Sequence, residues 1–93
     1  MQLKLGKKTY TTKKLTGAAL WESLEFEEEL KKEEVLIKKL NMMAEQVIKL
    51  YDNQFEIKDI QDGLNADEVW QILNLQCFGV GIKMAKKIQT KND

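Results

Sequence analysis

The stretch that decides the fold is 36–51, LIKKLNMMAEQVIKLY. Its apolar residues recur at spacings of three, four and seven, and this periodicity predicts an amphipathic helix. The main stripe consists of Leu36, Leu40, Met43, Val47 and Leu50. Ile37, Ala44, Ile48 and Tyr51 lie beside that stripe. A helix with one apolar face needs other elements to cover that face, so we expect the fold to form around this segment.

Upstream of this segment, the chain has no Pro or Gly between residues 18 and 52, which favours helix throughout. Thr16 is a suitable N-cap, so we expect a long helical region over 16–51. The strongly polar stretch 27–34 is where a bend would divide it. The sequence leaves open whether 16–51 forms one helix or two.

The first residues alternate in the manner of a β-hairpin over 2–12. Gly6 and Lys7 are the expected central residues of a type II′ turn, which prefers Gly in its first central position. That turn sets Leu5 opposite Lys8 and Leu3 opposite Tyr10. Because an isolated hairpin is marginally stable, its apolar face is expected to lie on helices.

Downstream, Asp52-Asn53-Gln54 interrupts the helix, and a short helix is expected over 57–62, ended by Gly63. Asn65 and Glu68 have the spacing of a capping box, which predicts a C-terminal helix over 66–88 and a frayed tail over 89–93. With 93 residues, the chain is expected to form a single domain, 1–93. The predicted fold class is mainly α (α+β), with the N-terminal β-hairpin packed on a small bundle of three to four helices.

The composition excludes most catalytic chemistry. The chain has no His and no Arg, only one Cys (Cys77) and one Ser (Ser23). An imidazole base and a zinc ligand set are therefore missing, and we expect no catalytic residues, metal site or cofactor. The lack of Arg argues against a sequence-specific nucleic-acid partner. Apolar runs of at most four residues argue against a membrane-spanning segment.

Charge is arranged in blocks. Residues 1–20 carry five Lys and no acid, residues 21–34 carry seven Glu against two Lys, and residues 50–68 carry six acids against one Lys. The whole chain has 15 Lys and 15 acids, for a net charge of zero. Two interpretations stay open: the blocks complement each other within the fold, or they dock onto a partner or a second copy of the chain.

Met42 and Met84 are candidate partner contacts, because Met adapts to irregular surfaces. The further candidates are Phe26, Lys38 and Lys39. For the large aromatic residues Trp21, Trp70, Phe26, Phe55 and Phe78, a core role is favoured over a binding role.

Three segments resemble the tail assembly chaperones of long non-contractile-tailed phages and their prophages, which are related in role to the lambda tail assembly chaperones. These segments are 3–17 (LKLGKKTYTTKKLTG), 47–55 (VIKLYDNQF) and 62–69 (DGLNADEV). The resemblance covers residues 2 to about 73. The Glu-rich stretch 25–34 and the glycines after Cys77 have no counterpart in it.

The resemblance implies a non-catalytic assembly factor in the host cell cytoplasm that binds the tape measure protein and keeps its hydrophobic helices from aggregating. It also implies a longer, frameshifted form that recruits the major tail protein. Two alternatives are a head–tail connector or tail-completion subunit retained in the virion, and a small nucleic-acid-binding regulator. Purified virions distinguish a chaperone from a retained subunit, because a chaperone is missing from them.

Overall fold

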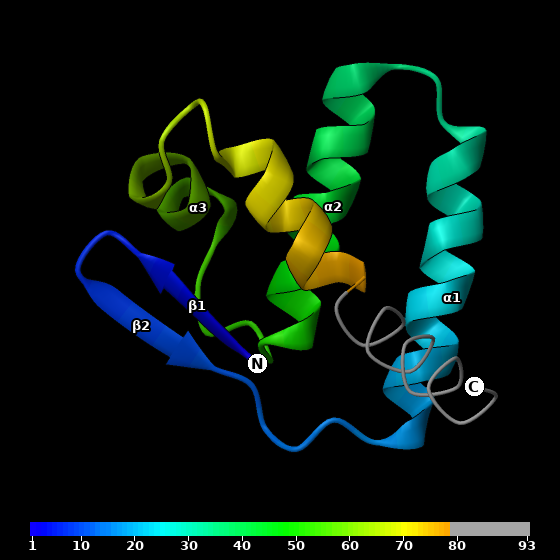
Figure 1. Cartoon of the computed structure of the whole chain (residues 1–93), viewed down its shortest axis with the longest axis horizontal. Coiled ribbons are helices and arrows are strands. Elements are labelled where there is room, and N and C mark those ends of the chain that lie inside the picture. Colours follow the sequence, from blue (N-terminus) through cyan, green and yellow to red (C-terminus); the bar gives the residue numbers. More distant parts are fainter. Residues whose placement is uncertain (79–93) are drawn as a thin grey trace, which may run out of the picture.

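The computed structural model describes residues 1–78, which form an N-terminal hairpin packed on helices (Figure 1). The elements are β1 (Gln2–Leu5), β2 (Lys8–Thr11), α1 (Gly17–Lys32), α2 (Leu36–Leu50) and α3 (Ile57–Gly63), followed by a helical segment over 69–78. This is the mainly α fold with a hairpin that the sequence predicts. The rest of the expected C-terminal helix and the tail 89–93 lie outside the described residues.

The hairpin has the predicted register. Leu5 pairs with Lys8 and Leu3 pairs with Tyr10. Gly6 has a φ of 63°, in the left-handed region that glycine adopts without strain, as the first central residue of a type II′ turn requires. Leu3 and Leu5 are buried against the helices, so the hairpin does not stand alone.

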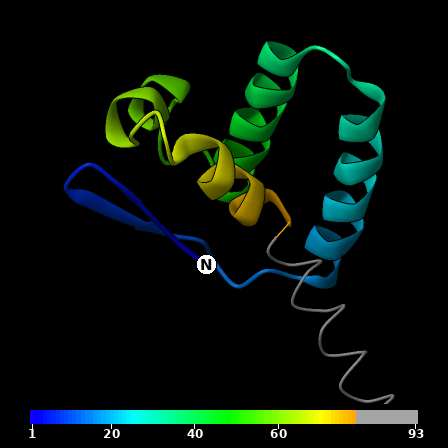
Figure 2. The same ribbon diagram turned by 45° about the horizontal axis from the view of Figure 1, so that its top comes forward.

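The long helical region is two helices. α1 ends at Lys32 and α2 begins at Leu36, and Figure 2 shows them as an antiparallel pair. The Glu33 carboxylate accepts hydrogen bonds from the backbone N–H groups of Glu34 and Val35, both at 3.1 Å, so it stabilises the connection. Thr16 occupies the N-cap position of α1 as expected, but its side chain makes no capping hydrogen bond.

α2 lies at the centre of the fold, with α1 on one side and α3 and the hairpin on the other (Figure 1). Met43, Val47 and Tyr51, on one face of α2 and at its C-cap, have no exposed area. The other buried members of this core are Leu3, Leu5, Ala44, Leu50, Phe55, Ile60, Leu73 and Cys77.

Tyr51 connects three parts of the fold. Its hydroxyl donates to Gln76 Oε1 at 2.6 Å, and Gln76 Nε2 donates to the Gln2 carbonyl at 2.9 Å. Its ring also packs against Phe55, with centroids 5.4 Å apart, and Phe55 packs against Tyr10 at 4.8 Å. The end of α2, segment 69–78 and β1 are therefore held together by one side chain and its neighbours.

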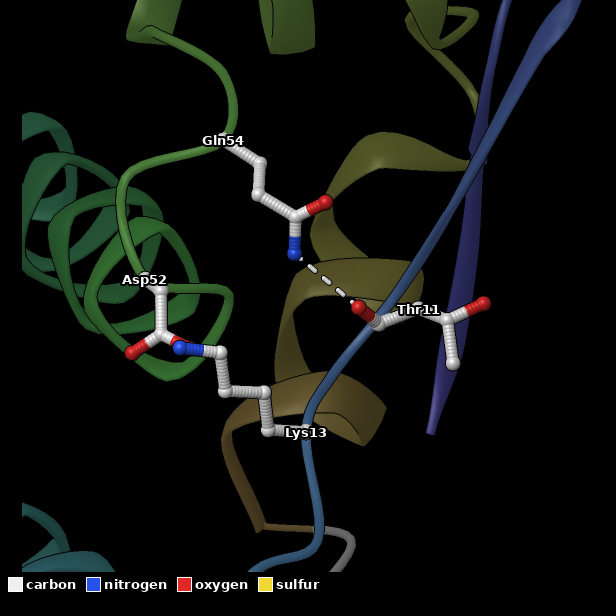
Figure 3. A network of polar contacts seen from close by, with 4 residues as sticks. All are labelled: Thr11, Lys13, Asp52 and Gln54. Carbon is white, nitrogen blue, oxygen red and sulfur yellow. Dashed lines mark hydrogen bonds and ion pairs between the residues drawn. The ribbon is translucent and has the colours of Figure 1, made fainter.

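The chain turns sharply after α2. Asp52 and Asn53 have φ values of 55° and 59°, in the left-handed region that these two residue types tolerate best after glycine. Figure 3 shows how the turn is attached to the hairpin: Gln54 Nε2 donates to the Thr11 carbonyl at 2.9 Å, and Lys13 Nζ lies 3.8 Å from Asp52 Oδ2.

The capping box predicted for Asn65 and Glu68 is only half formed. Glu68 accepts from the Asn65 backbone N–H at 3.0 Å, one half of the predicted capping box. α3 has a complete capping box between Glu56 and Asp59, which we did not predict.

Gly63 has a different role from the expected one. It is the last residue of α3 rather than a left-handed residue beyond it, and its carbonyl accepts from the Gly6 N–H at 3.0 Å. A Cβ atom at Gly63 would lie 2.8 Å from Leu5 Cβ and 2.9 Å from the Leu5 backbone. Glycine is therefore required there by the close approach of α3 to β1.

We expect Gly63→Ala to lower the free energy of unfolding by about 1–3 kcal/mol, because α3 and β1 must move apart. Gly17→Ala is the matched control, because nothing lies within 4 Å of a Cβ atom at Gly17. That control should leave stability unchanged or raise it by up to about 1 kcal/mol. Urea unfolding of both variants checks the prediction, which equal stabilities would contradict.

Candidate functional site

Exposed apolar side chains gather where α2 begins. Leu36 and Ile37, in its first turn, are 69% and 60% exposed, and Trp70 in segment 69–78 is 41% exposed. Together with Leu40 they line a groove of about 390 Å³, which we call the apolar groove. Since all four lining residues are apolar, the apolar groove suits an apolar side chain rather than a polar small molecule.

The apolar groove exists because the core face of α2 is longer than the elements that cover it. Leu36 and Met43 are seven residues apart, so they share one face of the helix. Met43 has no exposed area, whereas Leu36 is 69% exposed. Segment 69–78, the yellow-to-orange ribbon in Figure 1, crosses α2 beyond the first turn and leaves that turn uncovered within residues 1–78.

The residues proposed from the sequence as partner contacts lie elsewhere. Phe26 is half-buried and packs against Phe78, with centroids 6.0 Å apart. Lys39 lines a smaller hollow of about 190 Å³ on the α1 side of α2, together with Leu30 and Phe78. Met42 is half-buried, Lys38 is exposed, and neither lines the apolar groove. Met84 lies outside the described residues.

Sequence reasoning missed the apolar groove because it assigned its residues to the core, and of these only Leu40 is half-buried against the core. Leu36 and Leu40 belong to the predicted core stripe, and a core role was favoured for Trp70. Trp21, also interpreted as a core residue, is 69% exposed on α1. Its helix buries only the small residues Ala19 and Ser23. Phe55 is buried, in agreement with its predicted core role.

A second hollow, of about 420 Å³, lies between residues 13–16, the first turns of α1 and the end of α2. Two of its lysines already have carboxylate partners: Lys13 lies 3.8 Å from Asp52, and Lys49 lies 3.9 Å from Glu22. All four side chains are at least about half exposed, so these pairs contribute little to stability.

Cys77 joins three helices and is inaccessible. Its thiol donates to the Met43 carbonyl at 3.3 Å, and its own carbonyl accepts from the Ser23 hydroxyl at 3.1 Å. Burial raises the pKa of the Cys77 thiol to about 12. A raised pKa keeps the thiol protonated and unreactive at neutral pH. Within residues 1–78, no three His, Cys, Asp or Glu side chains gather closely enough to hold a metal ion.

No helix among residues 1–78 is long and apolar enough to cross a membrane.

The model of one protein family, described as phage tail chaperone protein, matches residues 1–93. The chain belongs to this phage tail chaperone family. Comparison of this tail chaperone with curated proteins and with solved structures finds no match. The family resemblance seen in the sequence is thereby confirmed.

We expect the tail chaperone to lose stability above about pH 9. Burial raises the pKa of Cys77 from 9.0 to about 12 and that of Tyr51 from 10.0 to about 12. The unfolded chain therefore releases these protons first, so the stabilisation is complete below pH 9 and is lost as pH rises to 12. Between pH 9 and 10, the free energy of unfolding should fall less steeply in Cys77→Ala than in the wild type. Urea unfolding at each pH measures this difference.

We also expect the apolar groove to be dispensable for folding. Leu36→Ala should change the free energy of unfolding by less than about 0.5–1 kcal/mol, because Leu36 is exposed. Met43→Ala, two turns along the same face, should cost about 2–5 kcal/mol. Thermal or urea unfolding compares the two variants. A large loss in Leu36→Ala would mean that this residue is part of the core.

Proposed function

We propose that this tail chaperone binds the tape measure protein in the host cytoplasm and aids assembly of the tail tube, without catalysing a reaction. Membership of the family supports the chaperone role. The observation that carries the proposal is the apolar groove, where Leu36, Ile37 and Trp70 are exposed. Such an exposed apolar surface is typical of an interaction site.

The shape of the apolar groove fits a helical client. It lies between α2 and segment 69–78, and a groove between two helices accepts the apolar face of a third. Tape measure proteins are expected to expose long apolar helices before the tube forms around them. Covering those helices would prevent them from aggregating. A longer, frameshifted form of the chain would then bring the major tail protein to the same client.

Co-expression tests this function. The wild-type chain should raise the soluble yield of a tape measure protein from the same phage or prophage. The double variant Leu36→Gln/Ile37→Gln should lose most of this effect, because it makes the apolar groove polar without adding charge. The matched control is Trp21→Gln/Leu24→Gln on α1, where the two residues are 69% and 49% exposed. That control should keep the effect.

The two double variants must first be shown to be folded by circular dichroism. If wild-type chain leaves the tape measure protein insoluble, the proposed function is wrong. If the yield is rescued by the α2 variant but not by the α1 variant, the client binds α1 instead of the apolar groove.

A further inference from the structure

The charges near the apolar groove bear on which helical segments bind to it. We propose that the groove binds amphipathic helices whose apolar stripe is flanked by Lys or Arg, so that basic helical segments of the client are selected over acidic ones. This inference rests on the proposed function and names the chemistry of the segment that binds.

Two exposed carboxylates lie within three residues, along the chain, of the residues that line the apolar groove. Glu34 precedes Leu36 by two residues, in the connection that leads into α2. Asp67 precedes Trp70 by three residues, in the turn that leads into segment 69–78. This turn has helical hydrogen bonding, because the Val69 N–H donates to the Asn65 carbonyl at 3.1 Å, so a separation of three residues puts Asp67 on the same side as Trp70. Each wall of the apolar groove therefore has an acid at its start.

These two carboxylates differ from most of the acids on α1. Glu27 and Glu28 pair with Lys31 at 3.9 Å and 3.5 Å, and Glu29 pairs with Lys32 at 3.4 Å. Within residues 1–78, neither Glu34 nor Asp67 has an ion-pair partner. No lysine of the described residues therefore neutralises their charge, while much of the acidic block of α1 is already compensated.

The two lysines near the start of α2 do not cancel this charge, and Lys49, near its end, pairs with Glu22. Lys39 lines the hollow on the α1 side of the helix, beside Glu27 and Lys31. Lys38 is one residue before it, a step of about 100° around the helix, and lies on the side of α2 opposite the Leu36–Met43 face. The carboxylates at the start of the two walls, which we call the acidic rim, are therefore not matched by Lys38 or Lys39.

This charge argues for a partner rather than a second copy of the chain. In a two-fold dimer the same patch meets itself, so the acidic rim would face an acidic rim. Like charges placed opposite each other across an interface disfavour that pairing. A helix with basic edges meets the rim with opposite charge on both sides.

The test uses two synthetic 14-residue peptides, one of Leu and Lys and one of Leu and Glu, each with Leu at helical spacing. The full chain carries Trp21→Phe, so that Trp70 is its only tryptophan. The Leu–Lys peptide should shift the Trp70 emission to the blue and bind at least tenfold more tightly than the Leu–Glu peptide. Its affinity should fall as salt is raised from 50 to about 500 mM, because exposed charges are screened.

Three substitutions test whether the peptide binds at the apolar groove. In the same background, Leu36→Gln should weaken the Leu–Lys peptide at least tenfold, and Glu34→Gln/Asp67→Asn should weaken it about threefold to tenfold. The matched control is Leu24→Gln, an exposed leucine among the glutamates of α1, and it should bind as before.

Three results would overturn the inference. Equal binding of the two peptides would remove the charge preference, and unchanged binding in Leu36→Gln would put the peptide elsewhere. A dimer seen by sedimentation, and abolished by Leu36→Gln, would assign the groove to a second copy. If the two peptides bind equally but co-expression still raises the soluble yield of the tape measure protein, the proposed function stands and only the charge selection is wrong.

Discussion

A phenol hydroxyl buried without an acceptor is costly to a fold, and Tyr51 has no exposed area. Its hydroxyl finds an acceptor in Gln76, whose amide group in turn donates to the Gln2 carbonyl. One requirement, the satisfaction of a buried phenol, thus fixes segment 69–78 and β1 against the end of α2. The rings of Phe55 and Tyr10 extend the same contact to the second strand. Most of the tertiary structure is therefore gathered at the C-terminal end of α2.

Gathering the fold at one end of α2 leaves the other end short of cover. The hairpin and α3 pack near Tyr51, and segment 69–78 reaches Met43 through the Cys77 thiol. Leu36 lies two helical turns before that contact, and α1 buries little beyond Ala19 and Ser23. A domain of this size has few helices and strands with which to cover the whole apolar face of α2. The exposed first turn of α2 is a consequence of where the fold is fixed, and it is the surface that we propose a client covers.

The sequence predicted what depends on neighbours along the chain. The hairpin register follows from Gly6, and the amphipathic face of α2 follows from its periodicity. The break after Tyr51 follows from Asp52 and Asn53, which tolerate a positive φ. Periodicity does not tell how far along a stripe the covering elements extend. Leu36 and Met43 are equivalent in that pattern, and only tertiary packing distinguishes a residue that is 69% exposed from one that is fully buried. Tertiary packing also explains why the candidates Phe26 and Lys39 do not line the apolar groove: both lie on the side of α2 that faces α1.

The charge blocks of the sequence divide into two kinds in the folded chain. Much of the block on α1 is compensated locally, since Lys31 and Lys32 pair with glutamates three or four residues before them. Lys49 and Glu22 provide a longer-range pair between α2 and α1. This is the interpretation in which blocks complement each other within the fold. Glu34 and Asp67 do not take part in that compensation within residues 1–78, and both stand beside the uncovered apolar residues. Unpaired carboxylates therefore lie next to uncovered apolar residues along the chain, at the start of both helical segments that line the apolar groove. Apolar area alone would bind any amphipathic helix, whereas the proposed acidic rim would let the surface discriminate among them.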